Sequence, residues 1–120
     1  MQNRITCLVA EPEPEAMRQI DVLARQIGAI DIRWKTRSLE SGVELVRKHR
    51  PEMAIVGLDP DPAAAIARIA EFSAEFPSLC VVALSARSDA DLILRAMRAG
   101  AHDFLRKPAT EADLRAAVEK

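Results

Sequence analysis

Four polar residues of different chemistry stand at the ends of short apolar runs: Glu11, Asp59, Ser85 and Lys107. A carboxylate can act as a nucleophile or bind a divalent cation, a hydroxyl can donate to an oxyanion, and an ammonium group can neutralise one. If the apolar runs are parallel strands, their carboxyl ends lie at one edge of the sheet, where folds of this kind bind ligands. The spacing therefore predicts a ligand pocket built from these four side chains.

The apolar runs have the pattern of strands in a parallel sheet. Three are continuous, as expected of strands that are covered on both faces: Ile5 to Ala10, Met53 to Leu58 and Leu79 to Leu84. A fourth run, Ile30 to Lys35, alternates apolar and charged residues, which favours an edge strand. A weaker fifth candidate is His102 to Leu105.

Segments with helical spacing of apolar residues separate and follow these strands, at residues 17–27, 39–46, 65–76, 92–97 and 114–118. Gly28 and Gly100 stand where helix C-caps are expected, and Asp61 before Pro62 has the pattern of an N-cap. Strands and helices thus alternate five times. This order predicts an α/β fold, a single (βα)5 doubly wound parallel sheet, over residues 1–120.

Composition excludes several classes of function. The 17 basic and 18 acidic residues nearly cancel, which argues against a nucleic-acid-binding protein. The start of the chain has no signal-like run and no segment is long enough to span a membrane, so we expect a cytoplasmic protein. Cys7 and Cys80 lack any metal-ligand spacing, and we expect both to be free thiols.

Two phrases carry a resemblance to a known family. Arg95 to Pro108 reads RAMRAGAHDFLRKP, and Ala83 to Arg87 reads ALSAR. Both resemble the CheY-like receiver domains of bacterial response regulators, and the resemblance covers the whole chain. It implies a flavodoxin-like three-layer sandwich with strand order 2-1-3-4-5, and a place in two-component phosphorelay signalling.

The resemblance also implies roles for individual residues. Receivers phosphorylate themselves on an Asp that ends the third strand, with Mg²⁺ held by acidic residues that follow the first. Ser85 corresponds to the hydroxyl that binds the phosphoryl group, Lys107 to the lysine that neutralises it, and Phe104 to the switch aromatic. The acidic pair is reduced to Glu11, and Gly57 stands at the phosphoacceptor position, so we expect at most weak Mg²⁺ binding.

Degenerate receivers with these phrases resemble the N-terminal domains of pilus-assembly proteins of the CpaE/TadZ type. In that family the receiver-like domain precedes a P-loop ATPase domain and takes part in localisation and protein contacts. The 120 residues contain no Walker motif, so ATPase activity is not expected of this chain. The resemblance implies that it is the N-terminal module of a longer protein.

The residues leave the roles of two carboxylates open. Asp59 is interpreted either as part of an Asp-Pro turn or as a phosphoacceptor that, with Glu11, holds Mg²⁺. Glu11 itself is either a metal ligand or a solvated residue of the loop Glu11-Pro12-Glu13-Pro14. For Lys107 we expect a structural ion pair with Glu11 or Asp59.

Two functions follow from these alternatives. The first is a non-enzymatic, phosphorylation-independent module that binds proteins or dimerises. The resemblance implies that its contact face comprises the fourth helical segment, the fifth strand and the fifth helical segment, which the family uses to dimerise. The expected contact residues are Leu92, Leu94, Met97 and Arg98. The second is a phosphorylatable receiver that uses Asp59 with Mg²⁺.

Overall fold

The computed structural model describes residues 4–119 and contains one parallel sheet of five strands in the order β2-β1-β3-β4-β5. The strands are β1 (Ile5–Ala10), β2 (Ile30–Thr36), β3 (Met53–Gly57), β4 (Cys80–Ser85) and β5 (Asp103–Arg106). The predicted fold class and strand order are confirmed. The alternating strand β2 lies at an edge of the sheet, as its pattern predicted.

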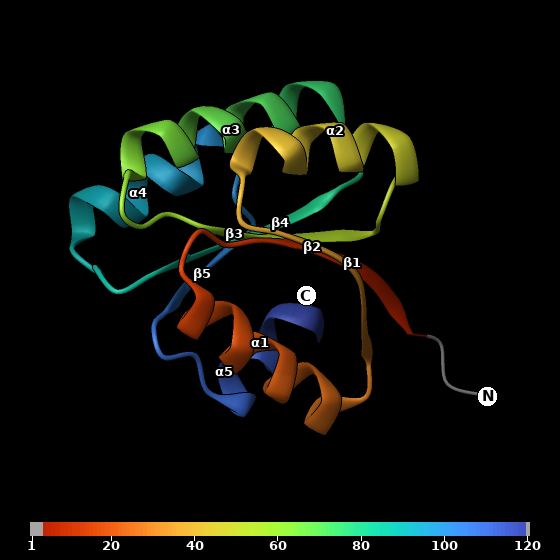
Figure 1. Ribbon diagram of the computed structural model, residues 1–120. Coiled ribbons are helices and arrows are strands. Elements are labelled where there is room, and N and C mark those ends of the chain that lie inside the picture. The colour runs from red at the N-terminus through yellow and green to blue at the C-terminus, as the bar shows by residue number, and fades with distance from the viewer. Residues whose placement is uncertain (1–3, 120) are drawn as a thin grey trace.

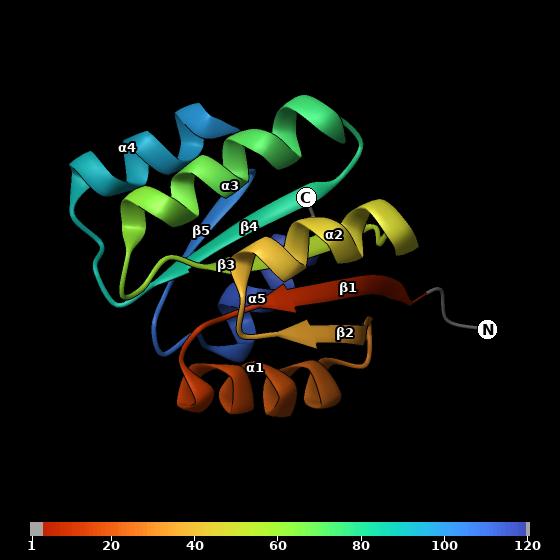
Figure 2. The same cartoon turned by 45° about the horizontal axis from the view of Figure 1, so that its top comes forward.

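Five helices cover the two faces of the sheet. On one face lie α2 (Leu39–His49), α3 (Pro62–Glu75) and α4 (Ala90–Ala99), and on the other lie α1 (Pro14–Ile27) and α5 (Glu111–Glu119). Figure 1 shows the three layers nearly edge-on, and Figure 2 shows α4 next to α3. The chain runs from β1 to β2 in one direction, and from β2 past β1 to β3, β4 and β5 in the other. This reversal produces the doubly wound arrangement.

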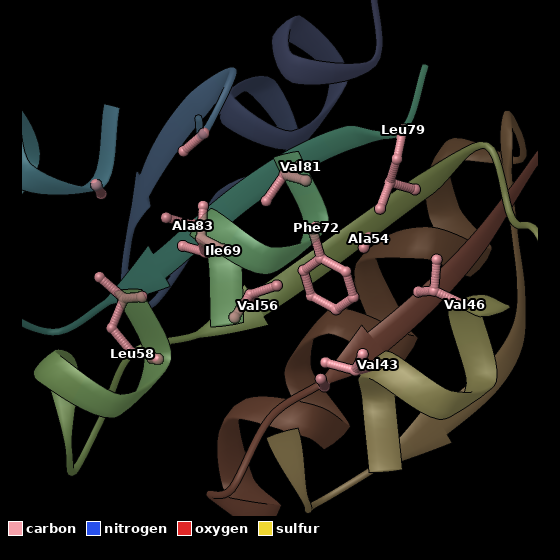
Figure 3. Packing of buried hydrophobic residues seen from close by; sticks show 14 of the residues in the cluster. Val43, Val46, Ala54, Val56, Leu58, Ile69, Phe72, Leu79, Val81 and Ala83 are labelled. Carbon is pink, nitrogen blue, oxygen red and sulfur yellow. The ribbon is translucent and has the colours of Figure 1, made fainter. Parts of the chain in front are cut away.

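Two hydrophobic cores form because successive strand residues point to opposite faces of the sheet. Leu8, Val56 and Phe72 belong to the core under α2, α3 and α4, part of which is shown in Figure 3. Cys7 and Ile55 belong to the second core, under α1 and α5. Burial on both faces explains why the central strands are continuous apolar runs.

Several element boundaries differ from the predicted ones by one residue. β3 ends at Gly57 rather than Leu58, and β5 begins at Asp103 rather than His102. The N-cap of α3 is Asp61, whose carboxylate accepts a hydrogen bond from the Ala64 N–H at 3.2 Å, as predicted.

Neither cysteine is paired. Cys7 is buried in β1 and Cys80 begins β4, and β3 lies between these strands. Burial raises the pKa of the Cys7 thiol, so the thiol stays protonated. In the part of the chain that the structure describes, no helix is long and apolar enough to cross a membrane.

Candidate functional site

The four predicted polar residues meet at the carboxyl edge of the sheet. Ser85 ends β4, Glu11 follows β1, Asp59 follows β3 by two residues and Lys107 follows β5. Together with Gly57, the last residue of β3, and the backbone of Ala86, they form what we call the carboxyl-edge pocket. Parallel strands place these residues together although up to 96 positions separate them in the sequence, from 11 to 107.

The ammonium group of Lys107 lies among three carboxylates. Its Nζ is 2.7 Å from Glu13 Oε1, 3.1 Å from Glu11 Oε1 and 3.2 Å from Asp59 Oδ2. Only 9% of the lysine side chain is exposed, so water screens these contacts weakly. Burial alone would lower the pKa of Lys107, but the hydrogen bonds and charges of Glu13, Glu11 and Asp59 outweigh it and raise the pKa.

The carboxylate of Asp59 faces the pocket and uses both of its oxygens. Oδ1 accepts a hydrogen bond from the Ser85 hydroxyl and Oδ2 accepts one from the Ala86 N–H, each at 2.8 Å. Burial opposes ionisation, but these hydrogen bonds and Lys107 together lower the pKa of Asp59. The Asp59 side chain therefore lies in the carboxyl-edge pocket.

Glu11 is fully buried, so its interpretation as a solvated loop residue is wrong. Its Oε2 accepts a hydrogen bond from the Glu13 N–H at 2.8 Å. The head of its side chain fills the space beside Gly57: all three carboxylate atoms lie within 2.8 Å of where a Cβ on residue 57 would stand. Burial is the main reason that the pKa of Glu11 is raised.

These residues do not fit a Mg²⁺ ion. Mg²⁺ requires oxygen ligands in near-octahedral geometry, and here the Lys107 ammonium already lies between the carboxylates of Glu11, Glu13 and Asp59. Within residues 4–119, no group of three or more His, Cys, Asp or Glu side chains is arranged to hold a metal ion. These carboxylates form ion pairs with the Lys107 ammonium group instead.

One of the expected contact residues on α4 is corrected by the structure. Leu92 is fully buried in the core under α2, α3 and α4, so it cannot contact a partner. Leu94 and Met97 are 47% and 40% exposed, and Arg98 is also exposed. Phe104, the expected switch aromatic, is partly buried and packs against the same core as Leu92.

The strand order and the polar pocket at the carboxyl edge define a flavodoxin-like α/β domain. A family model described as "Response regulator receiver domain" matches residues 7–119. The chain therefore belongs to the response regulator receiver domain family.

Solved structures agree on the fold. The receiver domain of NarL from Mycobacterium tuberculosis has a TM-score of 0.87 at 18% identity, over 98% of this chain and 94% of that one. A response regulator from Thermotoga maritima has a TM-score of 0.85 at 22% identity, over 97% and 95%. A pilus assembly-related protein from Burkholderia pseudomallei has a TM-score of 0.87 at 22% identity, over 99% and 90%. No curated protein matches the sequence significantly.

Sequence reasoning missed two contacts of the carboxyl-edge pocket. Glu13 contacts Lys107, and the Ala86 N–H binds Asp59. Glu13 lies in a proline-punctuated loop, and its residue type alone does not distinguish it from a solvated neighbour. For Ala86 a signal existed, because backbone N–H groups in a turn at the edge of a sheet can bind an anion.

Proposed function

We propose that this receiver domain is a phosphorylation-independent protein-interaction module, in which Gly57 stands in place of the phosphoacceptor. The observation that carries the proposal is the position of Glu11, whose carboxylate fills the space that a side chain on residue 57 would need. Such packing requires glycine at the end of β3, and glycine has no side chain to phosphorylate. The domain then acts through its surface and not as an enzyme.

The alternative, a phosphorylatable receiver that uses Asp59 with Mg²⁺, is supported by the orientation of the Asp59 side chain into the pocket. The contacts of that side chain weigh against it. Both Asp59 oxygens already accept hydrogen bonds, from the same Ser85 hydroxyl that would have to bind a transferring phosphoryl group and from the Ala86 N–H. Lys107, which would neutralise that group, is held by Glu11 and Glu13. We therefore also propose that the domain uses no metal cofactor.

Incubation with Mg²⁺ and a small phosphodonor such as acetyl phosphate, followed by intact-mass measurement, tests this choice. We expect no phosphoryl adduct on the wild-type domain, because both oxygens of the candidate acceptor Asp59 already accept hydrogen bonds. A receiver with an intact acceptor Asp serves as the positive control. An adduct that disappears in Asp59→Asn would establish the alternative function.

We further propose that α4, β5 and α5 form the contact face and that its partner is a second copy of this chain. α4 exposes Leu94 and Met97 beside the basic residues Arg95 and Arg98, whereas α5 begins with the acidic residues Glu111 and Asp113. A two-fold pair would place the basic end of α4 against the acidic start of the partner's α5. The two apolar side chains would then be covered at the centre of the contact.

Sedimentation equilibrium of Leu94→Glu and Met97→Glu tests the contact face. We expect each charge to weaken dimerisation by about tenfold or more, because it is buried without a partner. Val22→Glu is the matched control, since Val22 on α1 is 44% exposed but lies on the opposite layer. A wild-type domain that stays monomeric, or an equal effect of Val22→Glu, would contradict this face.

Finally, we propose that the domain belongs to the CpaE/TadZ type and serves pilus assembly together with a downstream ATPase domain. The support is the match of the phrases RAMRAGAHDFLRKP and ALSAR, with the structural likeness to a pilus assembly-related protein. The sequence of the parent polypeptide tests the proposal. A variant Walker motif after this domain supports it, and a DNA-binding output domain contradicts it.

A further inference from the structure

Three hydrogen-bond donors from two separate parts of the chain converge on one carboxylate. The Ser85 hydroxyl, the Ala86 N–H and the Lys107 ammonium lie 2.8, 2.8 and 3.2 Å from the oxygens of Asp59. A hydroxyl, a backbone amide and a cation directed at one point form a binding site for an oxyanion. Here the anion belongs to the protein itself.

The site connects the loop after β3 to the loop after β4 through side-chain contacts. Asp59 lies between β3 and α3, whereas Ser85 and Ala86 lie at the end of β4 and in the loop that leads to α4. Ser85 Oγ also accepts a hydrogen bond from the Arg87 N–H at 3.0 Å, so the serine is held from both sides. The side chain of Asp59 thus fixes the first residues of the β4–α4 loop.

The same loop leads by further contacts to the start of α4. The Arg87 guanidinium pairs with the Asp89 carboxylate at 3.1 Å. Asp89 is the N-cap of α4 and accepts a hydrogen bond from the Leu92 N–H at 3.3 Å. A continuous series of contacts therefore runs from Asp59 to the first turn of α4, the helix that exposes Leu94 and Met97.

We propose that Asp59 is the built-in ligand of an oxyanion site and that its binding holds α4 in the arrangement used for protein contact. The domain then needs no added phosphoryl group or ion to order this face. The second half of the proposal rests on the proposed function of α4 as a contact surface; the first half does not.

Removal of the internal ligand should create a site for an external one. In Asp59→Ala the Ser85 hydroxyl and the Ala86 N–H lose their acceptor, and Lys107 loses one of its three carboxylates. Inorganic phosphate can supply the missing oxygens. We expect the Tm of Asp59→Ala to fall, and to rise again by about 5 °C at a phosphate concentration roughly ten times the Kd. Chloride at matched ionic strength should not restore it.

Asp61→Ala is the matched control. It removes an equal charge two residues away, and it breaks only the α3 cap, in which Asp61 accepts from the Ala64 N–H. Wild type and Asp61→Ala should show the same small response to phosphate. An equal response in all three proteins would overturn the oxyanion site.

Amide NMR shifts of residues 86–97 test the link to α4. In Asp59→Ala these shifts should move away from their wild-type values, and phosphate should return them. Restoration of the Tm without any movement of these shifts would overturn the second half of the proposal. If Asp59→Ala does not fold, Asp59→Ser provides the same comparison, because its short side chain also leaves the place of the carboxylate empty.

This design separates the inference from the proposed function. A wild-type domain that does not dimerise contradicts the second copy as partner, yet the Tm and the amide shifts still report on Asp59. Conversely, a dimer disrupted by Leu94→Glu with no selective phosphate response in Asp59→Ala leaves the contact face in place and removes its link to Asp59.

Discussion

Lys107→Met is expected to lower the free energy of unfolding by about 3–5 kcal/mol at neutral pH, as when one partner of a buried ion pair is removed. The change leaves the carboxylate of Glu11 without its cation, and Glu11 is fully buried. It also removes a neutralising charge from Asp59 and Glu13. Urea denaturation of both proteins measures the loss.

A second substitution identifies the cause. Adding Glu11→Gln to Lys107→Met removes the buried charge and should recover about 1 kcal/mol or more. Lys35→Met is the matched control, because Lys35 pairs with Asp21 while 46% exposed and should change stability by less than about 1 kcal/mol. Equal losses of stability in Lys107→Met and Lys35→Met would show that the burial of Lys107 and its carboxylates adds nothing to the strength of their ion pairs.

The pH dependence of this loss has a defined sign. The pKa of Lys107 is raised in the folded protein above its ordinary value of 10.5. Its stabilising contribution is therefore complete below pH 10.5 and falls as the pH rises through the raised value. The difference in the free energy of unfolding between wild type and Lys107→Met should therefore shrink over that alkaline range. Urea denaturation of both proteins at a series of pH values measures it.

Gly57→Ala is the second substitution with a large expected effect. The new methyl group would overlap the Glu11 carboxylate, which is held by Lys107 and by the Glu13 N–H. Either the strand or the glutamate must move, and overpacking of this kind costs about 1–3 kcal/mol. The free energy of unfolding from urea denaturation at neutral pH tests the expectation.

The double-mutant cycle with Glu11→Ala shows whether the overlap is responsible. Once the glutamate is shortened, the methyl group on residue 57 enters vacated space, and alanine also restricts the unfolded chain. Gly57→Ala should then be neutral or stabilising, which gives a coupling energy of about 1 kcal/mol or more. An unchanged cost in both backgrounds would mean that Glu11 is not what excludes a side chain at residue 57.

The fold could be predicted because its signals are repeated along the chain. Three apolar runs, one alternating run and the helical spacings all predict the same alternating α/β fold. The strand order came from the resemblance to receiver domains. The helical spacing also could have identified Leu92 as a core residue and not a contact residue. Leu92 and Ala96 are four residues apart and both face the core, whereas Leu94 and Met97 lie on the outer side of the same helix.

The pocket was harder to predict because its unusual feature is a residue without a side chain, Gly57, beside the buried Glu11 carboxylate. Ala10 pairs with Val56 in the sheet, so the next residues, Glu11 and Gly57, are neighbours across two strands. The predicted strand order made these two strands neighbours but did not fix their register, which is what brings the glutamate beside the glycine. The orientation of Asp59 had no comparable signal, because an Asp-Pro step alone is equally compatible with a plain turn.

The contact between Glu11 and Gly57 also limits how the sequence can evolve. On the proposed function, a return to phosphorylation needs an aspartate at residue 57, but any side chain there meets the Glu11 carboxylate. Shortening Glu11 first would leave the buried Lys107 with one carboxylate fewer. Each single step toward an aspartate at residue 57 is therefore expected to be unfavourable, so on the proposed function residues 11 and 57 can change only together.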